Sequence, residues 1–480
     1  MNEIVRIKSN SFFSFLSIGS RIIPNVLIFW ILARYFGPTT FGKFSYSHTL
    51  ANTFLLFADF GFDLLLTTEI AKNRLKANLI FQQYFWIKIC LALLALLGML
   101  AFVLIRGGDY ESIILGMLFG FYMLFNTLTN FFVASFKGFE RLDYDARVSL
   151  VMNLFLFFSA SVLFLFKENI FLIALAYVFS RILGLLYSVK LTSRVMPRLD
   201  YKLTFDNYDD NLKKAFMYGI LILASSFLFQ LDTILIGIFR NDYEVGVYQA
   251  VKNLLLVPFI IPGVVFSALL PTLARTFKES VEGWVSLNKN FFKIVFWLNL
   301  PISVILFIYP RQIIEIIYST KNYSSAIPIL QIFAIILFLR STSDYMGVML
   351  ITSGRQKIHI YTSLSGIILS FILSCIIIPT QGAYGASIVY LSIISFISIV
   401  YMAVNFKVFV EHILNSRYLF LLALSVITAF IVHEFSIINA FIGIPLILFA
   451  FVVYALTFFF TSNEKKNILS MKYLIRFRKN

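Results

Sequence analysis

Nine ionisable side chains fall inside long apolar stretches of the chain, where charge is uncommon. They are Arg21, Asp59, Asp63, Lys88, Arg181, Asp232, Lys252, Arg340 and Asp344. A charge at the centre of a bilayer costs about 2.5–3.5 kcal/mol on insertion scales, so such side chains face one another or a water-filled cavity rather than lipid. We therefore expect these residues to bind charged cargo or ions.

The set leans towards positive charge. A hydrated cationic cavity suits an anionic cargo, and an arginine can hold a phosphate group through two parallel hydrogen bonds. We expect the basic members of the set, Arg21, Lys88, Arg181, Lys252 and Arg340, to make such a cavity cationic. The acidic residues expected to couple an ion or to form pairs are Asp59, Asp232 and Asp344. Arg340 and Asp344 lie four residues apart and share a helix face, which favours an ion pair between them.

Other roles stay open for several of these residues. Lys88 and Lys252 lie within a few turns of a membrane surface, from which a lysine can extend its ammonium group into water. Asp59 and Asp63 lie near one end of their apolar stretch and could cap a helix or pair with arginines in the adjoining loop.

The composition defines the class of protein that must position these residues. Of the 480 residues, 60% are hydrophobic and 13% charged, against about 45–50% and about 25% in soluble domains. This excludes an ordinary soluble enzyme and a disordered chain. The net charge of +16 comes from basic residues that punctuate apolar runs, so we expect no nucleic-acid partner.

Enzyme and metal motifs are missing from the sequence. It contains no Walker A sequence, zinc motif or nucleophile elbow, and its four histidines occur singly. Cys90 and Cys375 both lie in apolar runs, so no disulfide framework is expected. We expect a non-enzyme with no cofactor or metal.

Apolar runs long enough to cross a bilayer predict an all-α polytopic membrane protein with about 14 transmembrane helices. The expected spans are 11–36, 43–66, 80–105, 111–136, 147–166, 169–190, 213–239, 245–274, 290–310, 325–353, 358–379, 383–406, 416–434 and 437–461. Most of the lysines and arginines outside the spans fall in alternate connections, and the positive-inside rule assigns these, with both termini, to the cytoplasm.

An internal repeat divides the expected spans into two halves. The turn after the first span resembles the turn after the seventh. In each, a glycine follows an apolar residue and lies two positions before an aromatic one, Gly42 before Phe44 and Gly246 before Tyr248. A second similarity joins residues 137–141 to residues 353–357. Both similarities join turns six spans apart, which predicts two pseudo-symmetric six-helix lobes around a central cavity.

The repeat and the polar stretches predict the following organisation: an N-lobe over 1–195 (spans 1–6), a cytoplasmic linker over 196–212, a C-lobe over 213–410 (spans 7–12), two extra helices over 411–462 (spans 13–14) and a basic cytoplasmic tail over 463–480.

Several stretches resemble a known family in their order and spacing. They are residues 32–42, 58–62, 230–237, 245–252, 270–273 and 379–386. The chain is similar over its length to Wzx-type polysaccharide flippases, of the multidrug/oligosaccharidyl-lipid/polysaccharide (MOP) exporter superfamily. The resemblance implies alternating access by two lobes around a V-shaped cavity, whose basic residues hold a diphosphate or acidic sugars. It assigns this substrate-binding role to Arg21, Lys88, Arg181, Lys252 and Arg340.

The resemblance also implies a cargo and a location. The cargo is an undecaprenyl-diphosphate-linked oligosaccharide, moved from the cytoplasmic to the outer leaflet of the bacterial cytoplasmic (inner) membrane. The pathway is O-antigen (lipopolysaccharide), capsule or related polysaccharide biosynthesis. Expected partners are this lipid, membrane lipids, a polysaccharide polymerase and a chain-length regulator, and the expected coupling ion is H⁺ or Na⁺. The last two spans depart from the twelve of many such flippases and resemble the pair that flanks a lipid groove in a related lipid II flippase.

Two alternatives belong to different functional classes. A cation-coupled multidrug antiporter of the same superfamily predicts a predominantly acidic lumen, which the excess of Arg and Lys disfavours. A membrane polysaccharide polymerase predicts a large loop on the non-cytoplasmic side, where the expected connections are short.

Overall fold

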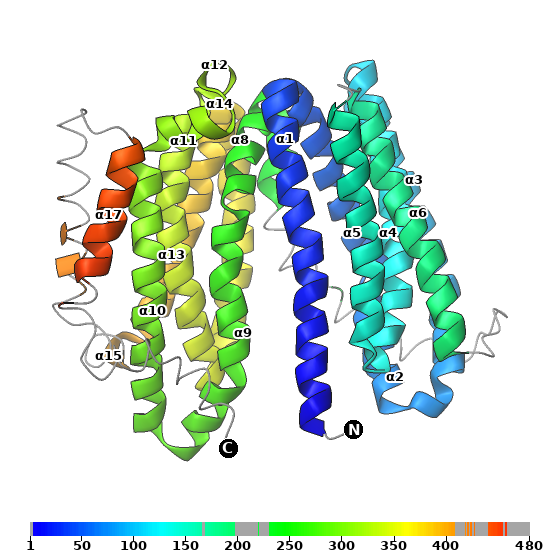
Figure 1. Cartoon of the computed structure of the whole chain (residues 1–480), viewed down its shortest axis with the longest axis horizontal. Coiled ribbons are helices and arrows are strands. Elements are labelled where there is room, and N and C mark those ends of the chain that lie inside the picture. Colours follow the sequence, from blue (N-terminus) through cyan, green and yellow to red (C-terminus); the bar gives the residue numbers. More distant parts are fainter. Residues whose placement is uncertain are drawn as a thin grey trace. The chain divides into compact units, whose positions relative to one another are not determined.

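The computed structural model describes residues 3–165, 169–196, 230–408 and 440–454, together with residues 219, 418, 420, 421, 423, 424, 427 and 457. Within these residues every regular element is a helix. The helices are long rods (Figure 1). The chain divides into two compact units.

Unit 1 comprises residues 1–254 and 371–386. Its helices are α1 (Glu3–Asp59), α2 (Phe62–Lys72), α3 (Ala77–Arg106), α4 (Tyr110–Gly138), α5 (Leu142–Leu165), α6 (Ile170–Val195) and α8 (Asp242–Leu254), with a short 3₁₀ turn at Arg74–Lys76. Helix α1 packs against α3, α4, α5 and α8, and α4 packs against α6. Residues 371–386 belong to the middle of α14 (Gln356–Val404).

Unit 2 comprises residues 255–370 and 387–480. Its helices are α9 (Leu256–Glu279), α10 (Val281–Ile308), α11 (Pro310–Ile317), α12 (Thr320–Tyr323), α13 (Ala326–Thr352), α15 (Phe406–Val408) and α17 (Ala440–Tyr454), with both ends of α14. Helices α9, α10 and α13 pack against one another, and α17 lies on α10.

The helices confirm an all-α polytopic membrane protein. Eight described helices are long and apolar enough to cross a membrane. Two of them, Leu16–Asp59 and Gln356–Val404, each hold two expected spans. Non-helical backbone at Gly37 (φ 75°) and Gly382 (φ 57°) breaks these two helices at the predicted turns. Both torsions lie in the region that favours glycine.

Several predictions fall on residues outside the described ranges. These are the linker over 196–212, apart from Met196, the tail over 463–480, and most of the seventh and thirteenth spans. The count of fourteen spans and the two six-helix lobes therefore stay predictions.

The structure corrects two predicted spans and adds two short helices. The second predicted span, 43–66, is not one continuous helix. Phe60 and Gly61 have positive φ and separate α1, which ends at Asp59, from α2, which continues to Lys72. The eighth span is interrupted at Leu255, between α8 and α9. Pro258 lacks an N–H, and its ring crowds the carbonyl of Leu254, four residues earlier. Helices α11 and α12 are too short to cross a bilayer, so apolar runs of membrane-spanning length do not predict them.

Side chains at the helix starts explain where several helices begin. Asp109, Asn169 and Ser280 precede α4, α6 and α10, and each accepts a hydrogen bond from a backbone N–H in the first turn. Such caps satisfy N–H groups that have no partner within the helix.

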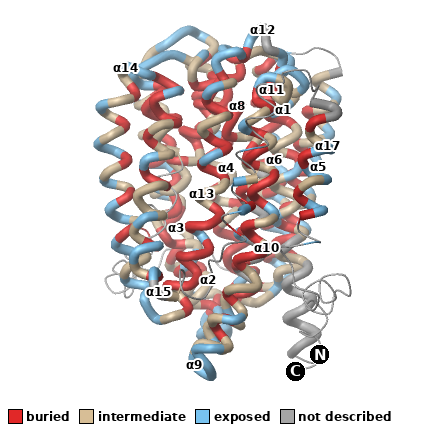
Figure 2. The backbone as a smooth tube through the Cα atoms, turned by 90° about the vertical axis from the view of Figure 1, so that its left-hand side faces the viewer, coloured by how far each residue is buried: buried red, intermediate tan, exposed pale blue. Residues whose placement is uncertain are grey.

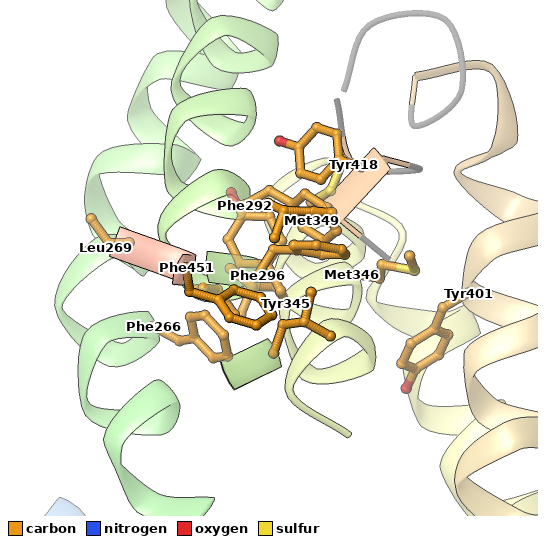
Figure 3. Packing of buried hydrophobic residues seen from close by; sticks show 14 of the residues in the cluster. Phe266, Leu269, Phe292, Phe296, Tyr345, Met346, Met349, Tyr401, Tyr418 and Phe451 are labelled. Carbon is orange, nitrogen blue, oxygen red and sulfur yellow. The ribbon is translucent and has the colours of Figure 1, made fainter. Parts of the chain in front are cut away.

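Burial follows the packing of the helices within each unit. Figure 2 shows α4, α10 and α13 with buried residues along most of their length, whereas exposed residues recur along α14. A cluster in unit 1 joins α2, α3 and α4 around Phe81, Phe131 and Phe132. A larger cluster in unit 2 joins α9, α10 and α13 (Figure 3).

Phe296 is a central member of the unit 2 cluster. Its ring packs edge-on against Phe338 and Tyr418, with centroid distances of 5.2 and 5.0 Å. We expect Phe296→Ala to lower the free energy of unfolding by about 3–5 kcal/mol, because the lost ring leaves a cavity. The measurement is denaturant unfolding in detergent. Leu298→Ala is the matched control, since Leu298 lies on the same helix but is exposed, and an equal effect of both variants would contradict the assignment of Phe296 to the core.

Candidate ion-pair sites within the membrane helices

Arg21 lies on α1 and faces α5 in unit 1. Its Nη2 donates to Asp145 Oδ1 at 2.8 Å and to Ser149 Oγ at 2.9 Å, and its Nε also reaches Ser149 Oγ. The Arg21 side chain is 41% exposed whereas that of Asp145 is buried. The guanidinium is thus anchored along one side and accessible on the rest of its surface.

Arg181, on α6, faces the same helix as Arg21 but finds no acid there. The residue is only 5% exposed. Its Nη1 lies 3.4 Å from the Met152 thioether sulfur, its guanidinium lies over the Tyr122 ring, and its Nε has no hydrogen-bond partner. No ion pair joins Arg181 to a carboxylate within the part of the chain that the structure describes. A buried guanidinium with no carboxylate beside it among the described residues is costly.

The two arginines contact α5 at neighbouring positions along its axis. Arg21 binds Ser149 and Arg181 contacts Met152, three residues and about one helical turn further along. Four residues from each arginine, Asn25 and Tyr177 join α1 to α6 through a hydrogen bond of 3.2 Å. Unit 1 therefore presents two guanidinium groups at neighbouring levels, of which one has an acidic partner.

Lys88 forms an ion triad where α1 gives way to α2. Its ammonium group lies 2.8 Å from Asp59 Oδ1 and 2.8 Å from Asp63 Oδ1, and its side chain is fully buried. Asp59 also accepts the backbone N–H of Asp63 at 3.0 Å, which caps the start of α2. Lys88 on α3 thus holds both ends of the break, and the alternative in which it reaches water at a membrane surface is wrong.

Lys252, on α8, pairs with Asp232 within unit 1. Its Nζ lies 3.0 Å from Asp232 Oδ1, and the Tyr248 hydroxyl donates to the other carboxylate oxygen. The Thr233 N–H donates to Asp232 at 2.7 Å. Lys252 is buried, so it does not extend to a membrane surface either.

Arg340 and Asp344 form the predicted pair on α13 in unit 2. Arg340 Nε lies 3.6 Å from Asp344 Oδ2, and Arg340 Nη1 donates to the Tyr390 hydroxyl at 2.6 Å. The guanidinium also lies over the ring of Phe259. The Asp344 side chain is 51% exposed although it lies within a membrane-spanning helix.

Charges also meet at the turn before α4. Lys43 pairs with Asp109 and Glu111. Hydrogen bonds from Lys43 and Ser112 lower the pKa of Asp109 to about 2, which keeps this carboxylate ionised at physiological pH. Among the residues that the structure describes, no group of three or more His, Cys, Asp or Glu could hold a metal ion.

The structure pairs most of the residues that the sequence predicted to bind cargo or to couple an ion. Asp59, Asp232 and Asp344 are partners of Lys88, Lys252 and Arg340. Asp145 was missed because the fifth span was expected to begin at 147, two residues after it. The pairing tyrosines 248 and 390 were missed because no sequence spacing distinguishes them from the many other tyrosines.

A comparison with protein families gives a match over more than half of the chain. Residues 7–277 match the model of a family described as polysaccharide biosynthesis protein. A curated relative, the teichuronic acid biosynthesis protein TuaB of Bacillus subtilis (strain 168), is 27% identical over 213 residues, or 42% of each chain. The chain thus spans less than half the length of this relative in the match.

Solved structures with the same fold include a lipid II flippase, MurJ, in an inward closed conformation. The TM-score is 0.72 at 15% identity, covering 92% of this chain and 98% of that one. An inward-facing multidrug resistance MATE family transporter of the MOP superfamily gives 0.63 at 11% identity, covering 82% and 98%. A MOP superfamily transporter from Pyrococcus furiosus gives 0.55 at 12% identity, covering 84% and 95%. At these identities the likeness shows the fold alone.

Proposed function

The chain belongs to the polysaccharide biosynthesis protein family, and from this premise we propose that it is a flippase for a lipid-linked oligosaccharide. Family membership and the polytopic helical fold agree with the resemblance that the sequence motifs indicated. The proposed cargo keeps its lipid tail in the bilayer while its charged and sugar-bearing part passes through the protein. Flipping itself makes and breaks no covalent bond.

One observation supports this function above the others, namely the buried guanidinium of Arg181. It has a thioether and an aromatic ring as neighbours, and no acidic partner in the described part of the chain. A membrane protein gains nothing in stability from such a charge, whereas a transporter of anions gains a binding site. The phosphate or carboxylate oxygens of the cargo are the proposed partners of Arg181, together with the accessible edge of Arg21, which contacts α5 about one turn away.

The remaining predicted cargo-binding residues form ion pairs. Lys88, Lys252 and Arg340 each have a carboxylate within hydrogen-bonding or ion-pair distance. We assign them a second role, in which they fix the helices around the cargo and keep the deep carboxylates compensated. In this proposal H⁺ or Na⁺ remains the candidate coupling ion.

The finer details of the sequence-based expectation are part of this proposal. The cargo is an undecaprenyl-diphosphate-linked repeat unit that moves to the outer leaflet of the bacterial inner membrane by alternating access of two lobes. It serves O-antigen, capsule or a related polysaccharide, and the termini are cytoplasmic. The name of the relative TuaB, for teichuronic acid biosynthesis, and that of the lipid II flippase MurJ support a lipid-linked saccharide.

The two alternative functions receive less support from the geometry. A polymerase needs a sizeable extracytoplasmic active site. The described connections at the end assigned to that side are turns at Gly37, Gly107–Asp109, residues 240–241 and Gly382, and the short α11–α12 segment. A carrier of cationic drugs has no use for the unpaired cation of Arg181.

Deletion of the gene tests the proposed function directly. We expect the deletion strain to accumulate a lipid-linked oligosaccharide on the cytoplasmic leaflet and to lose the corresponding surface polysaccharide, with both effects reversed by the wild-type gene. Normal arrival of the intermediate at the outer leaflet, in a strain without a second carrier, would contradict the proposal.

A further inference from the structure

Two glycines that the sequence repeat pairs are in backbone contact in unit 1. A Cβ atom on Gly42 of α1 would overlap the carbonyl oxygen of Asp242 and come within 2.9 Å of the Gly246 nitrogen. A Cβ atom on Gly246 of α8 would overlap the carbonyl oxygen of Pro38 and come within 3.1 Å of the Gly42 nitrogen. Neither position has room for any side chain.

The contact is reciprocal. Each glycine lies against the carbonyl of the residue four positions before the other glycine. Pro38 and Gly42 on α1 are therefore equivalent to Asp242 and Gly246 on α8. A pseudo-two-fold axis passing between the two glycines produces such a pattern. The repeat read from the sequence therefore has a structural counterpart at this point, where the same residue of each copy meets its equivalent.

An ion pair beside the glycines joins the same segments. Arg106, the last residue of α3, places Nη2 2.7 Å from Asp242 Oδ1 and donates through Nε to the Gly237 carbonyl at 3.1 Å. Its guanidinium lies 4.0 Å from the centre of the Tyr46 ring. Both side chains of the pair are about four-fifths buried, so water screens their attraction only partly.

A second set of contacts joins α8 to the turn within α14. Glu244 accepts the Ala383 N–H at 2.8 Å and pairs with Arg240 at 2.8 Å. The turns at residues 37–42, 106–109, 239–242 and 379–383 are thus held together. The positive-inside rule assigns all four turns to the non-cytoplasmic side.

Polar contacts continue from the glycines towards the middle of the membrane. The Gln249 amide of α8 donates to Thr49 of α1 at 3.2 Å and to Thr233 at 2.9 Å, and one turn further along α1 the Thr53 hydroxyl bonds Gln230. Thr49, Thr53, Thr233 and Gln249 are buried, so hydrogen bonds fill the space between α1 and α8 below the glycines.

We propose that Gly42, Gly246 and the Arg106–Asp242 pair form a clasp that closes the non-cytoplasmic exit for the cargo. This inference rests on the proposed function for the identity of the cargo. In each cycle the 38–42 segment separates from the 242–246 segment, and the Arg106–Asp242 pair breaks. The strength of that pair sets how often the exit opens, and the glycines allow the exit to close completely.

Thiol labelling from outside the cell tests the clasp without requiring transport. The reporter is Thr49→Cys, a buried position two turns from Gly42, in a C90A/C375A background that lacks the native cysteines. The probe is a membrane-impermeant maleimide. Breaking the pair with D242N removes a charge-assisted hydrogen bond, and we expect labelling to accelerate by about tenfold.

Three further variants make the test specific. The charge exchange R106D/D242R is expected to return labelling towards the wild-type rate. G246A is expected to accelerate labelling as D242N does, because the added methyl group meets backbone that cannot move aside. Lys72→Met, at an exposed pair with Glu69, is the control and leaves labelling unchanged.

The outcomes separate the clasp from the proposed function. Faster labelling in D242N and recovery in the exchange variant support the clasp, whatever saccharide the protein carries. Equal labelling in wild type, D242N and G246A, with transport intact, would overturn the clasp and leave the flippase proposal in place. If the variants are labelled as expected but the protein moves no lipid-linked saccharide, the clasp is supported and the proposed cargo is overturned.

Discussion

Arg181→Met is expected to reduce saccharide export by about 10- to 100-fold, the equivalent of losing one or two hydrogen bonds between a charged group and its ligand. The same variant is expected to unfold at the same temperature as the wild type or a higher one. Its neighbours are the Met152 sulfur and the Tyr122 ring, so the substitution leaves no carboxylate without a partner and removes an uncompensated buried charge.

The opposite directions of these two effects distinguish cargo binding from a structural role. Export is measured as surface polysaccharide in a complemented deletion strain, and stability as thermal unfolding of the purified protein. Arg181→Lys retains a charge and is expected to recover part of the export. Arg147→Met, at an exposed arginine of α5, is the control for both measurements. A large loss of stability in Arg181→Met would show that the guanidinium is part of the fold instead.

Lys88→Met is expected to destabilise the protein strongly. It leaves Asp59 and Asp63 buried without the ammonium group that both contact. Removing one partner of a buried ion pair costs about 3–5 kcal/mol, so the unfolding temperature of the purified protein should fall by many degrees. The cap that Asp59 provides for α2 also loses its orientation.

A compensating variant tests whether the carboxylates cause this loss. Lys88→Met combined with Asp59→Asn and Asp63→Asn leaves no buried charge in the triad and is expected to recover much of the lost stability. Lys72→Met removes an exposed pair and should change the free energy of unfolding by less than about 1 kcal/mol. A Lys88→Met protein as stable as the wild type would show that the triad does not hold the break between α1 and α2.

The fold class followed from the sequence because hydrophobic length and charge placement are properties of single segments. The turns at Gly37 and Gly382 were predicted for the same reason, since each lies between two runs of membrane-spanning length. The break at Phe60–Gly61 was missed because α2 continues the apolar pattern of α1 with little change in composition. It depends on Lys88, which comes from another helix.

The candidate site was predicted in part. The cost of burying charge identified the residues, and helical periodicity paired Arg340 with Asp344. Periodicity could not pair Arg21 with Asp145, because partners on different helices are set by packing. For the same reason the five cations looked alike in the sequence. The structure distinguishes Arg181, which has no acid beside it within the described ranges, from the four that form ion pairs.

Flipping by the purified protein in liposomes tests most directly whether the chain moves an anionic lipid-linked oligosaccharide and whether Arg181 binds it. The liposomes carry a fluorescent, anionic lipid-linked oligosaccharide, and a reagent that cannot cross the membrane quenches only the outer leaflet. We expect wild-type protein to make the lipid of the inner leaflet accessible to the quencher. In liposomes with Arg181→Met and in protein-free liposomes, that lipid is expected to stay protected. If wild-type protein leaves that lipid protected as well, or if Arg181→Met flips it at the wild-type rate, the account is contradicted.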